Sequence, residues 1–468
     1  MSRWFSLSTW LLTTQGLFAA GFSLARIATT EEQTLIRPST PIVGDGVAYW
    51  QSRGSSAPDG GGERLFSFPG GTIASDLRTE SEEGDFPVGV PLDAAGGKLL
   101  VSGRYYQPTP PQGFLIHNTL VEYPGGRRLL YPFSKFPDGI AGSPDLSIGG
   151  GLYDADGSIV FSLRQVQGLS VVFTALGRLS GGTVSILVRT GVDAVPGTTT
   201  PFASLGRYST HGGVTIFYGQ GGDRRGIYQL SASGLSKVLE DGDPAPDGGG
   251  GILSIRDDSL LSLANEGSDL VIANADSGGW IYKRVQGTWS LVARAGTPIP
   301  GGVGNFLSLS SPAIHDGAVM FFGGRNNIFL PPLQLGLYVE TSNGLKPVVD
   351  LGADFGGLNV AFLQVPASGG RYWDGEKVVF NVANATRDRY ALYMASPGLR
   401  IGSFELVGLT GSGRLQFPSE AGVSYRVEQS TNCVTWSTAK TVSGTGSTIT
   451  VEGLPSDGLR RFFRLATP

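Results

Sequence analysis

Cysteine, histidine and charge are all scarce in this chain of 468 residues. The single cysteine, Cys433, excludes an intramolecular disulfide and a cysteine-rich metal site, and we expect it in a small buried apolar position. Only three histidines are present, His117, His211 and His315. Charged residues make up 16% of the chain, the net charge is −4, and no basic stripe occurs. This balance argues against binding to nucleic acid or to an anionic membrane surface.

Long apolar runs are missing except near the N-terminus. Arg3 precedes a nearly uncharged stretch that ends in small residues at Ala25, and polar residues follow at once. This order of basic, apolar and small residues predicts a secretory signal over residues 1–25. The alternative is a membrane anchor, which needs about 20 predominantly apolar residues. Because residues 13–16 dilute the apolar run, the signal is favoured and the mature chain is expected to lack a membrane span.

Helical periodicity with caps is also absent, whereas glycine and proline are abundant. The chain has 72 Gly and 28 Pro, about a fifth of all residues, against about 12% in average usage. The hydrophobic fraction of 40% and the aromatic fraction of 10% suffice for a core and argue against disorder. Glycine between β-branched and aromatic runs is typical of short strands joined by tight turns. The composition therefore predicts an all-β fold.

Two series of glycines reveal an internal repeat with a period of about 55 residues. Each member of the first series opens an alternating apolar run: Gly46, Gly97, Gly157, Gly213, Gly267, Gly317 and Gly375. Each member of the second series ends a short aromatic strand: Gly70, Gly125, Gly177, Gly234, Gly287, Gly344 and Gly398. The two series keep the same period over the whole region, which indicates seven repeats.

One repeat contains four strand candidates, which is the content of a β-propeller blade. A third element, Gly-Asp-Pro-x-Pro at Gly242 and Gly-Thr-Pro-x-Pro at Gly296, follows a strand and should end it. We expect this segment to form an extended, semi-rigid crossing between neighbouring blades. The sequence thus predicts a seven-bladed propeller of four-stranded blades over residues 26–398. Closure of the ring is expected from residues 33–38 as the outer strand of the last blade, with 399–401 as the competing donor.

Residues 399–468 depart from the repeat and contain six short strand candidates, which predict a small β-sandwich. The segment that begins at Tyr425 reads Tyr-Arg-Val-Glu-Gln-Ser-Thr-Asn, Trp436 follows, and Arg-Phe-Phe-Arg begins at Arg461. This pattern resembles a small C-terminal β-sandwich module of exported proteins from environmental bacteria. The repeats, with their Gly-Asp/Thr-Pro-x-Pro and Gly-Ile/Leu-Tyr motifs, resemble poorly characterised secreted bacterial proteins. These resemblances imply an exported protein, with attachment to the cell surface as one option, and they imply no particular reaction.

Candidate site residues are few. Aspartates cluster in two glycine-rich loops, Asp241, Asp243 and Asp247 in one and Asp154 and Asp156 in the other. Either loop offers oxygen ligands for calcium, although neither has EF-hand spacing, and turn formation explains the same residues. His211 and His315 occupy equivalent turns and are expected to be exposed and well apart. The recurring Phe and Tyr of the repeats are expected to pack between blades.

The sequence favours an exported, non-enzymatic binding or surface-interaction protein that holds its ligand with loop side chains on a rigid ring. The ligand is unknown, with a polysaccharide or a cell-surface component as candidates, and no cofactor is expected apart from the calcium alternative. One alternative is a carbohydrate-active hydrolase or lyase with carboxylates at the channel, although no catalytic residue is identified. A second alternative is a structural protein of the cell envelope. The expected location is extracellular, at the cell surface or in the periplasm.

Overall fold

The structure is a computed structural model that describes residues 22–466 with gaps. The gaps are residues 30–38, 54–62, 69, 76–83, 110–112, 131–133, 138–139, 141–145, 168–169, 249–253, 256–260, 276–278, 301, 303, 326–334, 342–343, 351–359, 365–368, 385, 387–388, 398–402, 408–411, 420–423, 431–435, 446–447 and 456–461. The predicted signal up to residue 21, Cys433, Gly398 and both predicted closing segments therefore lie outside the described residues. Two units emerge, one containing Arg26–Met394 and one containing Ala395–Pro468 with the first residues of strand β1.

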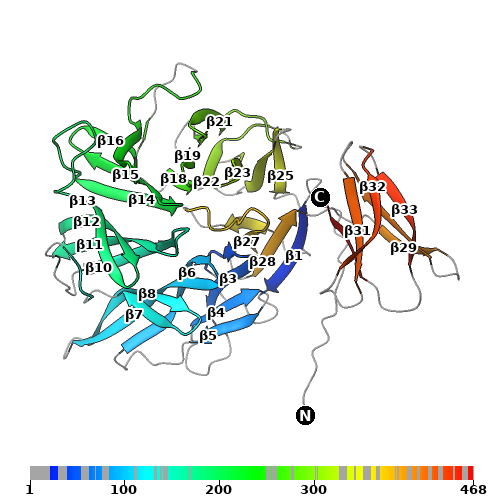
Figure 1. The fold of residues 1–468 in the computed structure, drawn as a ribbon, viewed down its shortest axis with the longest axis horizontal. Coiled ribbons are helices and arrows are strands. Elements are labelled where there is room, and N and C mark those ends of the chain that lie inside the picture. The colour runs from blue at the N-terminus through cyan, green and yellow to red at the C-terminus, as the bar shows by residue number, and fades with distance from the viewer. Residues whose placement is uncertain are drawn as a thin grey trace, which may run out of the picture. The chain divides into compact units, whose positions relative to one another are not determined.

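Seven four-stranded antiparallel sheets surround a central axis, as expected for a seven-bladed propeller (Figure 1). Blades 1 and 2 comprise β2 (Ile42–Gly44), β3 (Val47–Arg53), β4 (Glu63–Phe68), β5 (Gly71–Ser75), β6 (Gly84–Ala95), β7 (Lys98–Thr109), β8 (Gly113–Tyr123) and β9 (Arg127–Leu130). Blades 3 and 4 comprise β10 (Leu146–Tyr153), β11 (Ile159–Gln167), β12 (Ser170–Ser180), β13 (Thr183–Arg189), β14 (Ser204–His211), β15 (Val214–Gly221), β16 (Arg224–Ser231) and β17 (Gly234–Glu240).

The remaining blades repeat this order up to the last one. Blades 5 and 6 comprise β18 (Leu261–Glu266), β19 (Asp269–Asn274), β20 (Trp280–Val285), β21 (Thr288–Arg294), β22 (Ser308–His315), β23 (Ala318–Gly324), β24 (Leu335–Thr341) and β25 (Gly344–Asp350). Blade 7 comprises β26 (Val360–Gln364), β27 (Val378–Asn384), β28 (Tyr390–Pro397) and, beside β28, β1 (Phe22–Thr29). Within each blade the first strand of the repeat is the inner strand and the fourth is the outer strand.

An N-terminal segment closes the ring, but it is not the predicted one. The place beside β28 is taken by β1, Phe22–Thr29, whereas the sequence analysis assigned it to residues 33–38. The segment reads Phe-Ser-Leu-Ala-Arg-Ile-Ala-Thr, and its first residues were attributed to the signal, whose expected end at Ala25 falls inside β1. Ala28 of β1 is 2% exposed and packs with Trp50, Phe66 and Leu392.

The first glycine series marks the hairpin between the inner and second strands of every blade. All seven glycines have positive φ, from 59° at Gly267 to 92° at Gly375, a conformation that other residues adopt only with strain. In the second series Gly177 is a correction, because it lies inside β12 and the turn of that blade is made by Gly181 and Gly182. A side chain at position 177 would meet the ring of Phe161, so this glycine serves packing.

The connections between blades also differ from the expected extended crossing. After β13 and after β21 the chain folds into a short hairpin-like loop closed by the antiparallel bridges Ala194↔Pro201 and Pro298↔Asn305. In the second of these loops, Gly296 N donates to Phe306 O and Phe306 N donates to Thr297 O. The outer strand β21 ends at Arg294, before the Gly-Thr-Pro-x-Pro segment, and this segment folds back on itself before the next inner strand begins.

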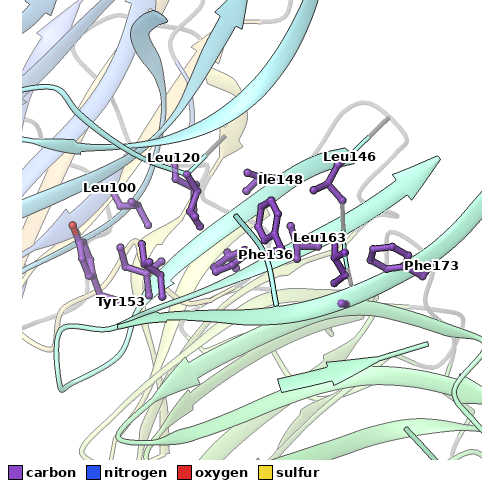
Figure 2. Packing of buried hydrophobic residues seen from close by; sticks show 14 residues of the cluster. Leu100, Leu120, Phe136, Leu146, Ile148, Tyr153, Leu163 and Phe173 are labelled. Atoms are coloured by element: carbon purple, nitrogen blue, oxygen red, sulfur yellow. The ribbon is translucent and has the colours of Figure 1, made fainter. Parts of the chain in front are cut away.

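The recurring aromatic residues fill the spaces between blades, as predicted. Phe202, Phe217 and Tyr228 form one trio, and Phe306, Phe321 and Tyr338 form its counterpart two blades later, with ring centroids 4.8–6.0 Å apart. Figure 2 shows the aliphatic counterpart between blades 2 and 3, where Leu100 and Leu120 meet Ile148 and Leu163. Each blade thus buries its apolar faces against both neighbours.

The smaller unit contains two three-stranded sheets, β29-β30-β33 and β32-β31-β34. The strands are β29 (Ser403–Val407), β30 (Ser412–Pro418), β31 (Ser424–Ser430), β32 (Ser437–Ser443), β33 (Thr448–Pro455) and β34 (Phe462–Ala466), close to the six predicted ones. Phe417 of β30 and Tyr425 of β31 pack edge to face in a core that both sheets share. Across the described parts of the chain, no helix is long and apolar enough to cross a membrane.

Candidate functional site

A cavity of about 410 Å³ lies in the channel, between the inner strands of blades 1 to 4. Its size is within the range of pockets that bind small ligands. The apolar part of its wall comes from β2, β6 and β10 and consists of Ile42, Val90, Pro91, Leu92 and Leu152. The polar part consists of Thr40, Ser162, Arg207 and Tyr208. The lining of the pocket therefore combines apolar side chains with side chains that can donate hydrogen bonds.

β-Bulges in two neighbouring inner strands shape the pocket. In β10 the register with β11 breaks between Gly149 and Leu152, so Gly150 and Gly151 have no ladder partner. In β14 the register breaks between Leu205 and Tyr208, which leaves Gly206 and Arg207 out of the ladder. Bulges bend a strand and redirect its side chains, and they often occur at functional sites. All four unpaired residues line the cavity.

The side chains of the polar wall differ in how they are engaged. Ser162 Oγ donates to Gly149 O, and Tyr208 OH donates to Val160 O at 3.3 Å. Burial, with a smaller effect of the negative charge of Asp93, raises the pKa of Tyr208, so its phenol stays protonated. The half-buried Arg207, in contrast, makes no ion pair or hydrogen bond within the described part of the chain.

A loop of blade 7 lies close to the pocket without lining it. This channel loop, residues 369–374, lies between β26 and β27 and contacts the inner strands one or two residues beyond those that line the cavity. It makes a polar contact with each of the six other blades. In blade order its partners are Val43 N, the Asp93 carboxylate, Tyr153 O, Thr210 O, Leu263 O and Ser311 O. The channel is thereby closed on the side of the inner hairpins.

Arg371 and Asp93 form the charged pair of the channel loop. Arg371 Nη2 lies 3.2 Å from Asp93 Oδ2, and the side chain of Asp93 is 2% exposed. Burial raises the pKa of Asp93, while the Arg371 guanidinium and the N–H groups of Tyr153 and Ala94 oppose this rise. Arg371 also donates to two backbone carbonyls. The guanidinium of Arg371 is therefore occupied by protein partners, and the Asp93 carboxylate balances its charge.

The carboxylates near the channel join the inner hairpins of neighbouring blades. An acceptor on one blade takes the N–H of the next blade at six of the seven junctions: Asp45 to Gly97, Asp93 to Tyr153, Asp154 to Gly213, His211 to Gly267, Glu266 to Asp316 and Asp374 to Gly46, at 2.6–3.2 Å. At the seventh junction His315 packs edge-on against Trp373 at 6.0 Å. These groups hold the ring together rather than facing the pocket.

The two histidines flank one hairpin instead of standing apart as free turn residues. His211 Nδ1 accepts from Gly267 N, and His315 Nδ1 lies 3.1 Å from Glu266 Oε1. Glu266, His315 and Asp316 are the one His/Asp/Glu group among the described residues with three ligand atoms within 4.8 Å of one another. Asp316 approaches Nε2 at 3.7 Å, however, so the two carboxylates face different nitrogens of the ring. The sequence pointed to both histidines, but it did not predict that the hairpin at Glu266 and Gly267 contacts both of them.

The predicted calcium residues lie in two separate places. Asp154 pairs with Arg178 at 2.9 Å, and Asp156 accepts from Ser158 N in the same hairpin. In the loop after β17, the carboxylates engage basic side chains of blades 4 and 5: Asp241 with Arg225 at 2.7 Å, Asp243 with Lys237 at 3.1 Å and Asp247 with Arg294 at 3.9 Å. Since β10 and β17 run in opposite directions within their blades and both loops follow the ends of these strands, the two clusters lie at opposite faces of the ring.

Comparison with solved structures gives distant likenesses. A crystal structure of puromycin hydrolase has 12% identity and a TM-score of 0.43, and a puromycin-hydrolysing peptidase of Mycobacterium tuberculosis has 12% identity and a TM-score of 0.34. The matches cover 83% and 82% of this chain but only 60% and 58% of those proteins, so the chain spans about three fifths of their length. The polysaccharide lyase Uly1 has 9% identity and a TM-score of 0.38, over 81% of this chain and 97% of that chain. Likeness at this level assigns no activity.

Comparisons of the sequence also identify few similar proteins. No curated protein matches the chain significantly. The model of a family of unknown function (DUF7453) matches residues 152–381. This stretch begins at Leu152 in the pocket wall and extends to β27, so it includes Arg207, Tyr208 and the whole channel loop. The chain is therefore similar to that family over the stretch that supplies Ser162, Arg207 and Tyr208 to the pocket.

Proposed function

We propose that the protein is an exported, non-enzymatic binding protein that holds a ligand in the channel pocket of its propeller. The observation that carries this proposal is the chemistry of the pocket wall. None of the described side chains that line it is a carboxylate, an imidazole or a thiol. These are the groups that most often serve as general acid, general base or activating base, within hydrogen-bond reach of the substrate or nucleophile.

The remaining hydroxyls are poor candidates for chemistry. Ser162 Oγ is engaged with a backbone carbonyl, with no base beside it in the described structure, and the raised pKa of Tyr208 keeps its phenol protonated. The nearest acid along the chain, Asp93, follows Leu92 but is buried and paired with Arg371. A rigid, pre-formed pocket of this composition favours recognition, because little conformational entropy is lost on binding. The bound side of the molecule would thus be the channel rather than the surface loops.

A labelled sample of the protein on an array of neutral and acidic glycans tests the proposal. Val90 lies at the pocket and is 41% exposed, so Val90→Trp should fill the pocket without disturbing the core. Val171, which is 44% exposed on β12, provides the matched control Val171→Trp. We expect V90W to lose glycan binding and V171W to keep it. Equal binding by both variants would rule out the channel pocket, and cleavage of a bound glycan would favour the hydrolase or lyase alternative.

A further inference from the structure

Arg207 is an unbalanced positive charge in a partly desolvated place. A guanidinium remains charged at any physiological pH and offers five N–H donors. Within the described chain this one has no acceptor, although it is half-buried. Partial burial of a charge without a partner costs free energy unless a ligand supplies the partner. An anion beside Arg207 would supply this partner.

The neighbouring backbone supports close approach of a ligand to this charge. Gly150 has a φ of 59° and Gly151 lies next to it, so two residues without side chains face the cavity where the ladder of β10 is interrupted. Gly206 precedes Arg207 in the second bulge. Backbone groups that leave a ladder need other partners, and a ligand oxygen or hydroxyl can serve. The polar wall thus combines one fixed charge with backbone sites at short range.

The rest of the pocket does not compensate the charge. Its described lining contains no acidic side chain, and the nearby Asp93 is paired with Arg371. Apolar side chains also line the cavity, which lowers the local dielectric and strengthens attraction between Arg207 and an anion. A wall of this mixed kind suits a sugar ring, which has C–H faces as well as polar edges.

We propose that the channel pocket recognises an acidic sugar, and that Arg207 binds its oxyanion, a carboxylate or a sulfate ester. The planar fork of the guanidinium matches both oxyanions with two parallel hydrogen bonds. This inference rests on the proposed function, because it presumes that the pocket is the binding site. It adds the charge of the ligand and the residue that selects it.

Calorimetric titration of the full chain with D-glucuronate, glucose 6-sulfate and neutral glucose tests the inference. We expect the anionic probes to bind about ten- to a hundredfold more tightly than glucose, the usual effect of one charge-assisted contact. Binding should weaken between about 0.01 M and about 1 M salt, where the screening length falls from about 30 Å to about 3 Å. Arg207→Ala should abolish both the preference and the salt dependence, and Arg207→Lys should restore them in part.

Arg294→Ala is the matched control, since it removes the same charge from an outer strand where the side chain is 63% exposed. Binding of one anionic probe or of both supports the inference and identifies the oxyanion. Equal affinity for glucose, unchanged binding by R207A, or no binding of either anion overturns it. If V90W loses binding of glycans while R207A does not, the pocket stands as the binding site and only the anionic ligand fails.

Discussion

At the scale of single residues, polar groups of the channel are divided between structure and recognition. Asp93, Asp154 and Glu266 accept backbone N–H groups of the next blade, so each carboxylate replaces part of the hydration that it loses on burial. Arg371 likewise has protein partners, the Asp93 carboxylate among them, whereas Arg207 has none among the described residues. The distinction depends on which charge has a protein partner, and it separates the ring-forming acids from the candidate ligand site.

His211 gives this arrangement a dependence on pH. Burial, followed by the positive charge of Arg371, lowers the pKa of His211 from its usual 6.5. The unfolded chain then binds a proton more readily than the folded chain, so the free energy of unfolding should fall as the pH drops through and below 6.5. Protonation of Nδ1 would also remove the acceptor for Gly267 N. The other charged groups that act on this ring are Glu266, Asp154 and His315.

The variant His211→Asn tests this effect, because an amide oxygen can accept the same N–H without titrating. Urea unfolding at about pH 7.5 and about pH 5 should show a smaller loss of stability for H211N than for the unchanged protein. The carboxylates contribute the same background to both proteins, so the difference isolates the histidine. Identical losses in the two proteins would contradict the assigned role of His211.

At the scale of elements, the channel loop depends on a glycine that fits between two inner strands. Gly370 has a φ of 66°, and a Cβ there would lie 3.0 Å from Cα and Cβ of Ala313. Gly370→Ala should therefore lower the free energy of unfolding by the strain of a left-handed residue, about 1–2 kcal/mol, and by a further overpacking cost of about 1–3 kcal/mol.

Gly296→Ala separates these two contributions. Gly296 has a φ of 93°, but no atom lies within 4 Å of a Cβ built there. Chemical denaturation should show a smaller loss for G296A than for G370A, and the difference measures the fit of the channel loop. Equal losses would mean that the loop yields without cost, against its close packing with Ala313 and Ala264.

The elements themselves were largely predictable, because glycine at the inner hairpins leaves a direct trace in the sequence. Gly177 was wrongly predicted to end a strand, because glycine also serves close packing, here against Phe161. The bulges of β10 and β14 were not predicted, although glycine inside a strand often marks a bulge, as Gly-Gly-Gly and Leu-Gly-Arg-Tyr do here. The pocket escaped notice because four strands far apart in the chain build it. One available signal was the extra segment Gly-Gly-Arg-Tyr-Trp before Gly375, which no other repeat contains.

At the scale of the whole molecule, β1 joins the start of the chain to its last blade. Removal of residues 22–29 should expose the edge of β28, because an outer strand supplies the hydrogen bonds of that edge. Hydrogen exchange at Tyr390–Pro397 should then become faster, and the seventh blade should unfold at lower urea concentration. The smaller unit has its own core, so removal of residues 403–466 is the control and should leave exchange in β27 unchanged. Unaltered exchange after loss of β1 would show that the ring closes without it.

The position of the channel loop in the chain has a consequence for synthesis and folding of the protein. A ribosome releases the chain from its N-terminus, so the inner strands of blades 1 to 6 emerge before residues 369–374 do. Until then the channel lacks Arg371, and the buried Asp93 lacks the cation that neutralises it. The contacts of this loop with the first six blades can therefore form only once the seventh repeat is present. A chain without the seventh repeat would lack residues 369–374 in the channel and would leave the Asp93 carboxylate without Arg371.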